Sequence, residues 1–288
     1  MKFPELIGVI HLPPLAGAPQ GTGHHPVELL QNAGMQAVRE ALAMVKAGFD
    51  AVFLENFGDA PFYKIQVPPE TTASMAIIAA AVREAVRVPV GIKILRNDAR
   101  SALAIAAVTG CEFIRVNLSS GVTNTNQELI EGESAFLLRE RARLQSHVSI
   151  LADFHIKHAQ FLSSSDLSLS IEEMNSRSMI DAIVLTGAAN GKMMDISQLQ
   201  IASRVARSKR IPLFLGSGVS QENLREIRPW VDGVIVDSDL REKGIAGAKL
   251  DLSRLQGWVK IFKSSSKKLK TSKKRHLQKK TKSQPKKR

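Results

Sequence analysis

The chain has 288 residues, of which 44% are hydrophobic, and it contains a single cysteine, Cys111. A chain of this length and composition can build one large α/β domain or two smaller ones. The single cysteine excludes a disulfide framework and predicts a reducing compartment. No apolar run approaches the roughly 18 residues that a membrane-spanning helix needs, so the sequence predicts a cytoplasmic protein without a membrane span.

The formal net charge of +13 is unevenly distributed along the chain. Of the 40 basic residues, 13 lie between Lys263 and Arg288, where no acidic residue occurs, so residues 1–262 carry 27 basic against 27 acidic groups. We therefore expect a neutral globular domain over residues 1–262 and a disordered basic tail over residues 263–288. Such a tail is typical of non-specific binding to nucleic acid or another anionic surface, or of a solubilising extension.

Strand-like and helix-like segments alternate along residues 1–262. Short apolar or β-branched runs predict eight strands: Ile7–Leu12, Ala51–Phe57, Val90–Leu95, Phe113–Leu118, Ser149–Ile156, Ala182–Gly187, Pro212–Ser217 and Gly233–Ser238. Helical periodicity predicts the segments between and after them: Pro26–Ala47, Pro69–Val86, Asp98–Val108, Leu129–Gln145, Ile171–Ile180, Ile196–Ala206, Gln221–Ile227 and Leu252–Phe262. Eight β/α units favour a single (β/α)8 TIM barrel, and a doubly wound open sheet is the alternative.

Polar residues gather at the C-terminal ends of the first five predicted strands, where TIM barrels place their active sites. The residues that we expect to do chemistry are His11, Glu55, Lys93, Asp153, His155 and Lys157. Those that we expect to bind substrate are Asn56, Asp59, Arg96, Asn97, Asp98, Arg115 and Asn117. Burying charge without a purpose is costly, so this convergence favours a functional site over a chance arrangement.

The fifth predicted strand carries the densest set of ionisable groups. Alternate side chains of a strand share a face, so Asp153, His155 and Lys157 would point the same way. An acid, an imidazole and an amine at that spacing can exchange protons, hold a metal or bind an anion. The alternative is a salt-bridged strand end without a chemical role.

The last three predicted strands end in small residues instead. Small side chains let backbone N–H groups reach an anion, and the loops after the seventh and eighth strands commonly bind phosphate in this fold. The residues that we expect to bind phosphate are Gly187, Gly216, Ser217, Gly218 and Ser238. Glycines also make ordinary turns, so position at the strand ends is what supports this prediction.

Several motifs, in order along the chain, closely resemble the BtpA family. They are the segments 7–17 (IGVIHLPPLAG), 55–62 (ENFGDAPF), 95–98 (LRND), 115–117 (RVN), 152–159 (ADFHIKHA) and 216–219 (GSGV), and the resemblance covers about residues 7–262. Members of that family are predicted TIM barrels. The founding role is in photosystem I biogenesis or stability, and many members occur where there is no photosynthesis. The resemblance therefore implies a barrel whose reaction is not assigned.

Two positions depart from the family pattern. The eighth predicted strand ends in Asp237-Ser238-Asp239, where the family usually has Gly-Ser-Ser, and carboxylates would repel a bound phosphate. Asn126 precedes Gln127 where the family often has an aspartate, so a carboxylate is missing from the loop after the fourth strand. Both departures weaken the prediction of a conventional phosphate site.

Two hypotheses follow for the function. In the first, the chain is an enzyme acting on a small phosphorylated metabolite of the sugar phosphate or nucleotide type, as an isomerase, lyase or glycosyl-bond hydrolase. Asp153 and His155 would be acid and base, Lys93 or Lys157 an electrophile or Schiff-base amine, and Arg96 with Arg115 an anion clamp.

A metal-dependent version of this enzyme would use Glu55, Asp153 and His155, but no tight ligand motif supports it, so we predict no metal site. The second hypothesis is a non-catalytic biogenesis or stability factor for a protein complex. The sequence identifies no cofactor and leaves a homo-oligomer open.

Overall fold

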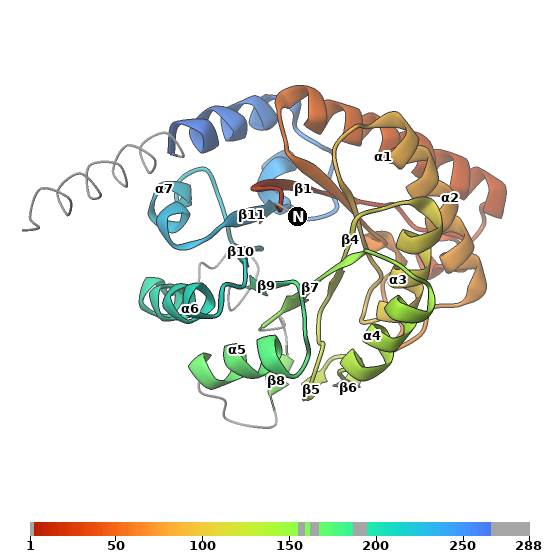
Figure 1. The fold of residues 1–288 in the computed structure, drawn as a ribbon. Coiled ribbons are helices and arrows are strands. Elements are labelled where there is room, and N and C mark those ends of the chain that lie inside the picture. Colours follow the sequence, from red (N-terminus) through yellow and green to blue (C-terminus); the bar gives the residue numbers. More distant parts are fainter. Residues whose placement is uncertain (1–2, 155–158, 162–166, 187–194, 266–288) are drawn as a thin grey trace, which may run out of the picture.

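The structure is a computed structural model that describes residues 3–154, 159–161, 167–186 and 195–265. Eight parallel strands close into a barrel in the order β1-β2-β3-β4-β7-β9-β10-β11, with β11 returning to β1 (Figure 1). Their bounds are β1 Leu6–His11, β2 Ala51–Glu55, β3 Val90–Lys93, β4 Phe113–Val116, β7 Ser149–Asp153, β9 Ala182–Leu185, β10 Leu213–Leu215 and β11 Gly233–Val236. The predicted TIM barrel is confirmed, and each of the eight predicted strands overlaps one of these strands.

Helices surround the barrel and connect successive strands (Figure 1). Their bounds are α1 Pro26–Ala47, α2 Pro69–Ala85, α3 Ala99–Thr109, α4 Ser134–Arg143, α5 Leu167–Ser176, α6 Ile196–Lys209 and α7 Leu224–Ile227, and residues 252–265 are also helical. Local chemistry fixes several ends. Asp98 and Asp195 cap the starts of α3 and α6 by accepting backbone N–H bonds, and Gly48 and Gly110 end α1 and α3 in the left-handed conformation that glycine adopts without strain.

The barrel strands are buried on both faces, as parallel strands covered by helices require. One apolar layer fills the barrel interior and includes Phe53, Phe113 and Phe214. Glycines make room for these rings, because a Cβ at Gly91 would lie 2.1 Å from the Phe113 ring. A second, larger layer packs between the strands and the helices. The apolar plug inside the barrel leaves the C-terminal strand ends as the place where polar side chains can face a cavity.

An antiparallel sheet outside the barrel is the main departure from the predicted elements. Three short strands form it in the order β6-β5-β8, with bounds β5 Val122–Thr125, β6 Glu128–Glu131 and β8 Ala159–Phe161. The prediction of a helix beginning at Leu129 is therefore wrong for its first residues, and α4 begins at Ser134. Burial alternates along β5, with Thr123 and Thr125 inward, which is the period of a strand and not of a helix.

Two further predictions concern segments that the structure describes only in part. The predicted fifth strand reaches Ile156, whereas β7 ends at Asp153 and Phe154 already bends away; His155 and Lys157 lie outside the described residues. Of the basic tail, residues 263–265 continue the last helix, and 266–288 lie outside the described residues. Among the residues that are described, no helix combines the length and the apolar character needed to cross a bilayer.

Candidate active site

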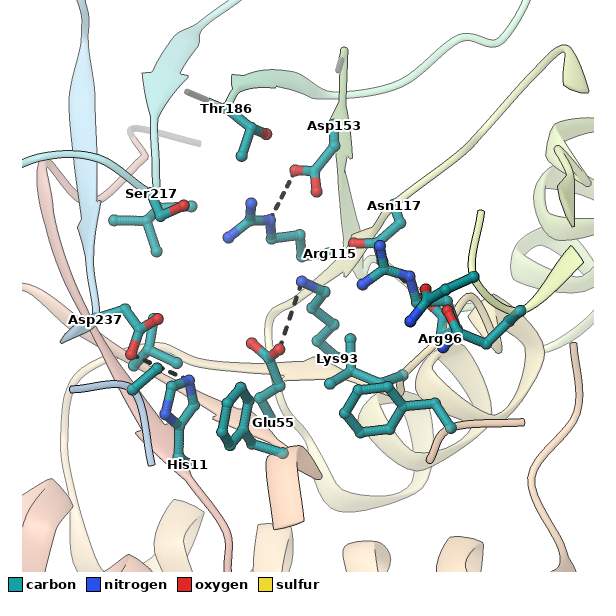
Figure 2. A pocket seen from close by; sticks show the side chains of 18 residues that line it. His11, Glu55, Lys93, Arg96, Arg115, Asn117, Asp153, Thr186, Ser217 and Asp237 are labelled. Atoms are coloured by element: carbon teal, nitrogen blue, oxygen red, sulfur yellow. Dashed lines mark hydrogen bonds and ion pairs between the residues drawn. The ribbon is translucent and has the colours of Figure 1, made fainter. Parts of the chain in front are cut away.

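A polar cavity of about 260 Å³ lies at the C-terminal ends of the barrel strands (Figure 2). The sequence-predicted residues that line it are His11, Glu55, Lys93, Arg96, Arg115, Asn117, Asp153 and Ser217. They come from β1, β2, β3, β4, β7 and the segments that follow β3, β4 and β10. Residues that were predicted from separate strand ends therefore line the same cavity.

Glu55 and Lys93 face each other across the floor of this cavity. They are the last residues of adjacent strands and pair in register, so the barrel itself fixes their separation. The Lys93 Nζ lies 3.6 Å from the Glu55 Oε1, and both residues are buried. Burial lowers the pKa of Lys93 despite the attraction of Glu55. Burial would raise the pKa of Glu55, but nearby cations, Lys93 first among them, hold that pKa below its usual value.

Arg115 and Asp153 form a tighter ion pair on the next two strands of the barrel, β4 and β7. The Arg115 Nε donates to Asp153 Oδ1 at 2.7 Å, and one terminal nitrogen donates to the Gly216 carbonyl at 2.8 Å. Arg115 thus links β4, the end of β7 and the segment after β10. Burial opposes its charge, but the adjacent Asp153 raises the pKa of Arg115 above its ordinary value. Asp153 is engaged in orienting Arg115, which makes it a weak candidate for a free general base.

His11 and Asp237 form a third polar pair beside the cavity. The backbone N–H of Gly247 donates to His11 Nδ1 at 2.9 Å, so a neutral imidazole carries its proton on Nε2. That Nε2 lies 3.0 Å from Asp237 Oδ1, and the ring stacks on Phe57 with 4.1 Å between centroids. Burial lowers the pKa of His11 and outweighs the opposing effect of Asp237. The geometry therefore holds a neutral histidine in one tautomer, with its Nε2 close to a carboxylate.

Two asparagines shape the segments after β3 and β4. Asn117 Nδ2 donates to the Arg96 carbonyl at 2.8 Å, which fixes the backbone at Arg96 while its side chain lines the cavity. Asn97 exchanges two hydrogen bonds with the backbone of Leu118. Burial lowers the pKa of Arg96, and Glu55 and Asp153 act in the opposite direction. Asn97 thus positions a rim segment and does not line the cavity.

The remaining predicted residues take other positions. Asn56 and Asp59 line a second cavity beside the first. Asp98 caps α3 and also accepts the Val67 N–H at 2.9 Å. Three of the predicted phosphate-binding residues, Gly216, Gly218 and Ser238, are not among the residues that line the first cavity. A fourth, Gly187, lies outside the described residues.

Several lining residues were not in the predicted set, namely Phe57, Phe62, Asn126, Gln127, Thr186, Asp237 and Ala246. Asp237 and Thr186 directly follow barrel strands, so the same strand-end rule could have selected them. Asn126 and Gln127 occupy the turn between β5 and β6, two strands that the sequence analysis did not predict. The Thr186 hydroxyl points toward the cavity region and has no hydrogen-bond partner among the described residues (Figure 2).

The cavity balances opposite charges and contains no recognisable metal-ligand cluster within the described part of the chain. Lys93, Arg96 and Arg115 supply cations, and Glu55, Asp153 and Asp237 supply carboxylates. Lys93 lies within electrostatic range of both arginines, which each help to lower its pKa. The predicted metal alternative included His155, which lies outside the described residues. What the described residues offer is acid–base chemistry beside a group of cations.

Solved structures with this architecture are numerous, and their similarity shows the fold alone. One is N-(5'-phosphoribosyl)anthranilate isomerase from Pyrococcus furiosus, with a TM-score of 0.53, 14% identity and coverage of 90% of this chain and 99% of the other. Another is thiamine phosphate pyrophosphorylase from Pyrococcus furiosus, with a TM-score of 0.54, 15% identity and coverage of 91% and 96%.

Sequence relatives are much closer. An uncharacterised protein of Methanocaldococcus jannaschii is 39% identical over 90% of this chain and 95% of the relative. The photosystem I biogenesis protein BtpA of a Synechocystis species is 38% identical over 89% of this chain and 87% of the relative. Residues 2–264 match the sequence profile described as the BtpA family. The chain therefore belongs to the BtpA family.

Proposed function

We propose that the chain is an enzyme that transfers protons to and from a small phosphorylated metabolite of the sugar phosphate or nucleotide type. The observation that carries this proposal is the Glu55–Lys93 pair, an acid and an amine held face to face at 3.6 Å on the floor of a buried polar cavity. Isomerase, lyase and glycosyl-bond hydrolase chemistry all need a proton donor and an acceptor in such a position.

The size and charge of the cavity support a small anionic substrate. Its volume of about 260 Å³ is slightly below the roughly 300–1,000 Å³ of drug-sized ligand pockets. Arg96 and Arg115 both act to lower the pKa of Lys93, and an anion bound beside these three cations would offset that effect. Asp153 would orient Arg115 toward the bound anion, because it accepts a hydrogen bond from the Arg115 Nε at 2.7 Å.

The lowered pKa of Lys93 supports a chemical role for its amine. Burial brings the neutral form within easier reach at cellular pH, and a neutral amine can accept a proton or form a Schiff base with a carbonyl substrate. Glu55 stays ionised and can accept a proton from the substrate or return one to it. Substrate binding between these two groups would replace their mutual contact.

The experiment is hydrogen–deuterium exchange of candidate substrates followed by NMR. The full chain is incubated in D₂O with ribose 5-phosphate, ribulose 5-phosphate and other enolisable sugar phosphates, and with nucleoside monophosphates assayed for release of the base. We expect deuterium at a carbon next to a carbonyl, or base release, with at least one compound. Borohydride added during turnover would trap a Schiff base on Lys93 and reveal it by mass.

Two variants and a matched pair on the surface make this test specific. Glu55→Gln and Lys93→Met remove the proposed groups, and Glu172→Gln and Lys209→Met remove a lysine–glutamate pair on α5 and α6 whose atoms lie 3.2 Å apart. We expect loss of exchange or base release of at least about 100-fold with the cavity variants and none with the surface variants. Equal activity in all four variants would overturn the role of the Glu55–Lys93 pair.

A second candidate is a biogenesis or stability factor that does not turn over a substrate. The name of the Synechocystis relative, which is 38% identical, favours it. A complementation test separates the two candidate functions, using a bacterial strain from which the gene for its own BtpA-family protein has been deleted. The Glu55→Gln and Lys93→Met variants should fail to complement this strain if catalysis is required. They should complement it if the barrel acts only by binding.

The basic tail supports a separate partner proposal, non-specific binding of nucleic acid or of another anionic surface. We expect the full chain to bind immobilised RNA with an affinity that falls steeply as salt is added. Truncation after Ser265 should abolish this binding, because residues 266–288 hold 12 of the 13 basic residues of the tail. The cut preserves the helix over 252–265, in which Phe262 and Ser265 are buried residues. Unchanged RNA retention by the truncated chain would contradict this proposal.

A further inference from the structure

A second cavity, of about 290 Å³, adjoins the proposed active site. Phe62 and Leu95 line both cavities, so the two hollows share a wall made of these two side chains. Hydrogen bonds anchor that wall. The Leu95 N–H donates to Asn56 Oδ1 at 2.7 Å, and the Arg96 N–H donates to the Tyr63 carbonyl at 3.1 Å. These hydrogen bonds fix the backbone between the two cavities, so the second cavity keeps a constant position next to the first.

The chemistry of the second cavity differs sharply from that of the first. Prolines and aromatic rings provide much of its wall, namely Pro19, Pro61, Pro68, Phe62 and Tyr63. Among the described residues, no lysine or arginine lines it. Rigid apolar rings and an aromatic side chain are the surfaces against which a flat apolar group packs best.

A few polar side chains give this cavity an edge that can recognise a ring with hydrogen-bonding atoms. Asp59 accepts the Leu15 N–H at 2.9 Å and the Asn56 amide at 3.0 Å, so its carboxylate is held in a fixed position. Thr71, at the start of α2, is buried and lines the same cavity. Oriented polar groups at the edge of an apolar pocket are the usual means of fixing the orientation of a heterocycle.

We propose that the two cavities bind two halves of one substrate: a sugar phosphate among Lys93, Arg96 and Arg115, and an aromatic or heterocyclic ring attached to it in the second cavity. This inference rests on the proposed function and narrows its substrate class to ring-bearing sugar phosphates. In this arrangement Phe62 and Leu95, which line both cavities, would lie beside the bond that connects the two halves.

The test compares a sugar phosphate without a ring with sugar phosphates that carry one. Ribose 5-phosphate carries the anionic half, and adenosine and uridine 5'-monophosphates carry that half together with a heterocycle. Isothermal titration of the full chain should show at least one of the monophosphates binding roughly tenfold more tightly than ribose 5-phosphate, as stacking of one ring on aromatic side chains provides. Adenosine and uridine, which lack the phosphate, should bind more weakly than their monophosphates.

Two variants act on the second cavity without touching the first. Ala18→Trp fills it from the rim, at a residue with φ −69° that any side chain can adopt. Tyr63→Ala removes an aromatic wall whose side chain is 57% exposed, so the fold should not depend on it. Both should abolish the advantage of the monophosphate while leaving ribose 5-phosphate binding unchanged. Val108→Trp, at a position 76% exposed on α3, controls for the added tryptophan.

The outcomes separate this inference from the proposed function. If ribose 5-phosphate binds, depends on Arg96 and gains nothing from an attached ring, the ring site is wrong and the proposed function stands. If neither ribose 5-phosphate nor the monophosphates bind, both are overturned. If the monophosphates bind more tightly but Ala18→Trp and Tyr63→Ala leave that advantage intact, the ring lies elsewhere and the second cavity is not its site.

Discussion

Two of the buried ion pairs in this barrel differ in whether they line a cavity. Arg241 has no exposed surface; it donates to Glu40 at 2.7 Å and to the Val9 carbonyl at 2.7 Å, while Gln36 also donates to Glu40. Lys93 and Glu55 are buried too, but their atoms are 3.6 Å apart and both line a cavity. The first pair is enclosed by protein, and the second faces a space that a ligand can enter.

This difference separates a structural role from a chemical one. Arg241 joins β1 and α1 to the segment after β11, and that segment carries Gly247, whose N–H donates to His11. The enclosed pair therefore helps to hold the loop that fixes the histidine tautomer. The open pair leaves both charged groups able to contact a ligand, which the proposed function requires.

The largest expected effect comes from breaking the enclosed pair. Arg241→Met leaves the Glu40 carboxylate buried without its cation, and we expect a loss of about 3–5 kcal/mol in the free energy of unfolding, measured by urea denaturation. Glu40→Met combined with Arg241→Met should recover much of this loss, because no lone charge remains. Arg143→Met, which breaks an exposed pair on α4, should change nothing measurable. Arg241→Met as stable as Arg143→Met would contradict the structural role.

Breaking the open pair should affect stability less and catalysis more. Glu55→Gln combined with Lys93→Met removes two partly desolvated charges together, so we expect a change of at most about 2 kcal/mol in the free energy of unfolding. The proton exchange described above should nevertheless disappear. A loss of stability as large as that of Arg241→Met, measured in the same urea titration, would show that the Glu55–Lys93 pair is structural too. The two pairs would then not differ in role.

The fold was predictable because the barrel strands are apolar runs and the helices keep their 3.6-residue period. The strand-end rule then brought Glu55, Lys93, Arg115 and Asp153 to one cavity, since parallel strands present their C-terminal ends together. Periodicity failed at Leu129, where only four residues form β6 before the helix begins at Ser134. So short a strand leaves no pattern that distinguishes it from the start of a helix.

The details of the site depended on contacts that no local pattern contains. Asp237 contacts His11 only because β11 closes the barrel against β1, which joins the two ends of the barrel sequence. The Gly247 N–H that selects the tautomer comes from a segment without helical or strand periodicity. The sequence pattern also did not show that Arg115 engages Asp153, which shifted the proposed acid–base role toward Glu55 and Lys93.

The smallest expected effect concerns the neutral histidine that the enclosed pair helps to position. The pKa of His11 lies below its ordinary value of 6.5, so the unfolded chain binds a proton more readily than the folded one, and stability falls as pH drops below 6.5. Between pH 7.5 and 5.5 this loss is at most about 1.4 kcal/mol.

His11→Asn removes the titrating group and keeps an acceptor for the Gly247 N–H, so urea denaturation across this range should show a shallower decline than in the parent chain. His147→Asn, at an exposed histidine, should leave the decline unchanged. If His11→Asn and the parent lose stability in parallel, His11 is not held neutral by its surroundings. The loop that Arg241 anchors would then fix the position of the His11 imidazole without fixing its charge.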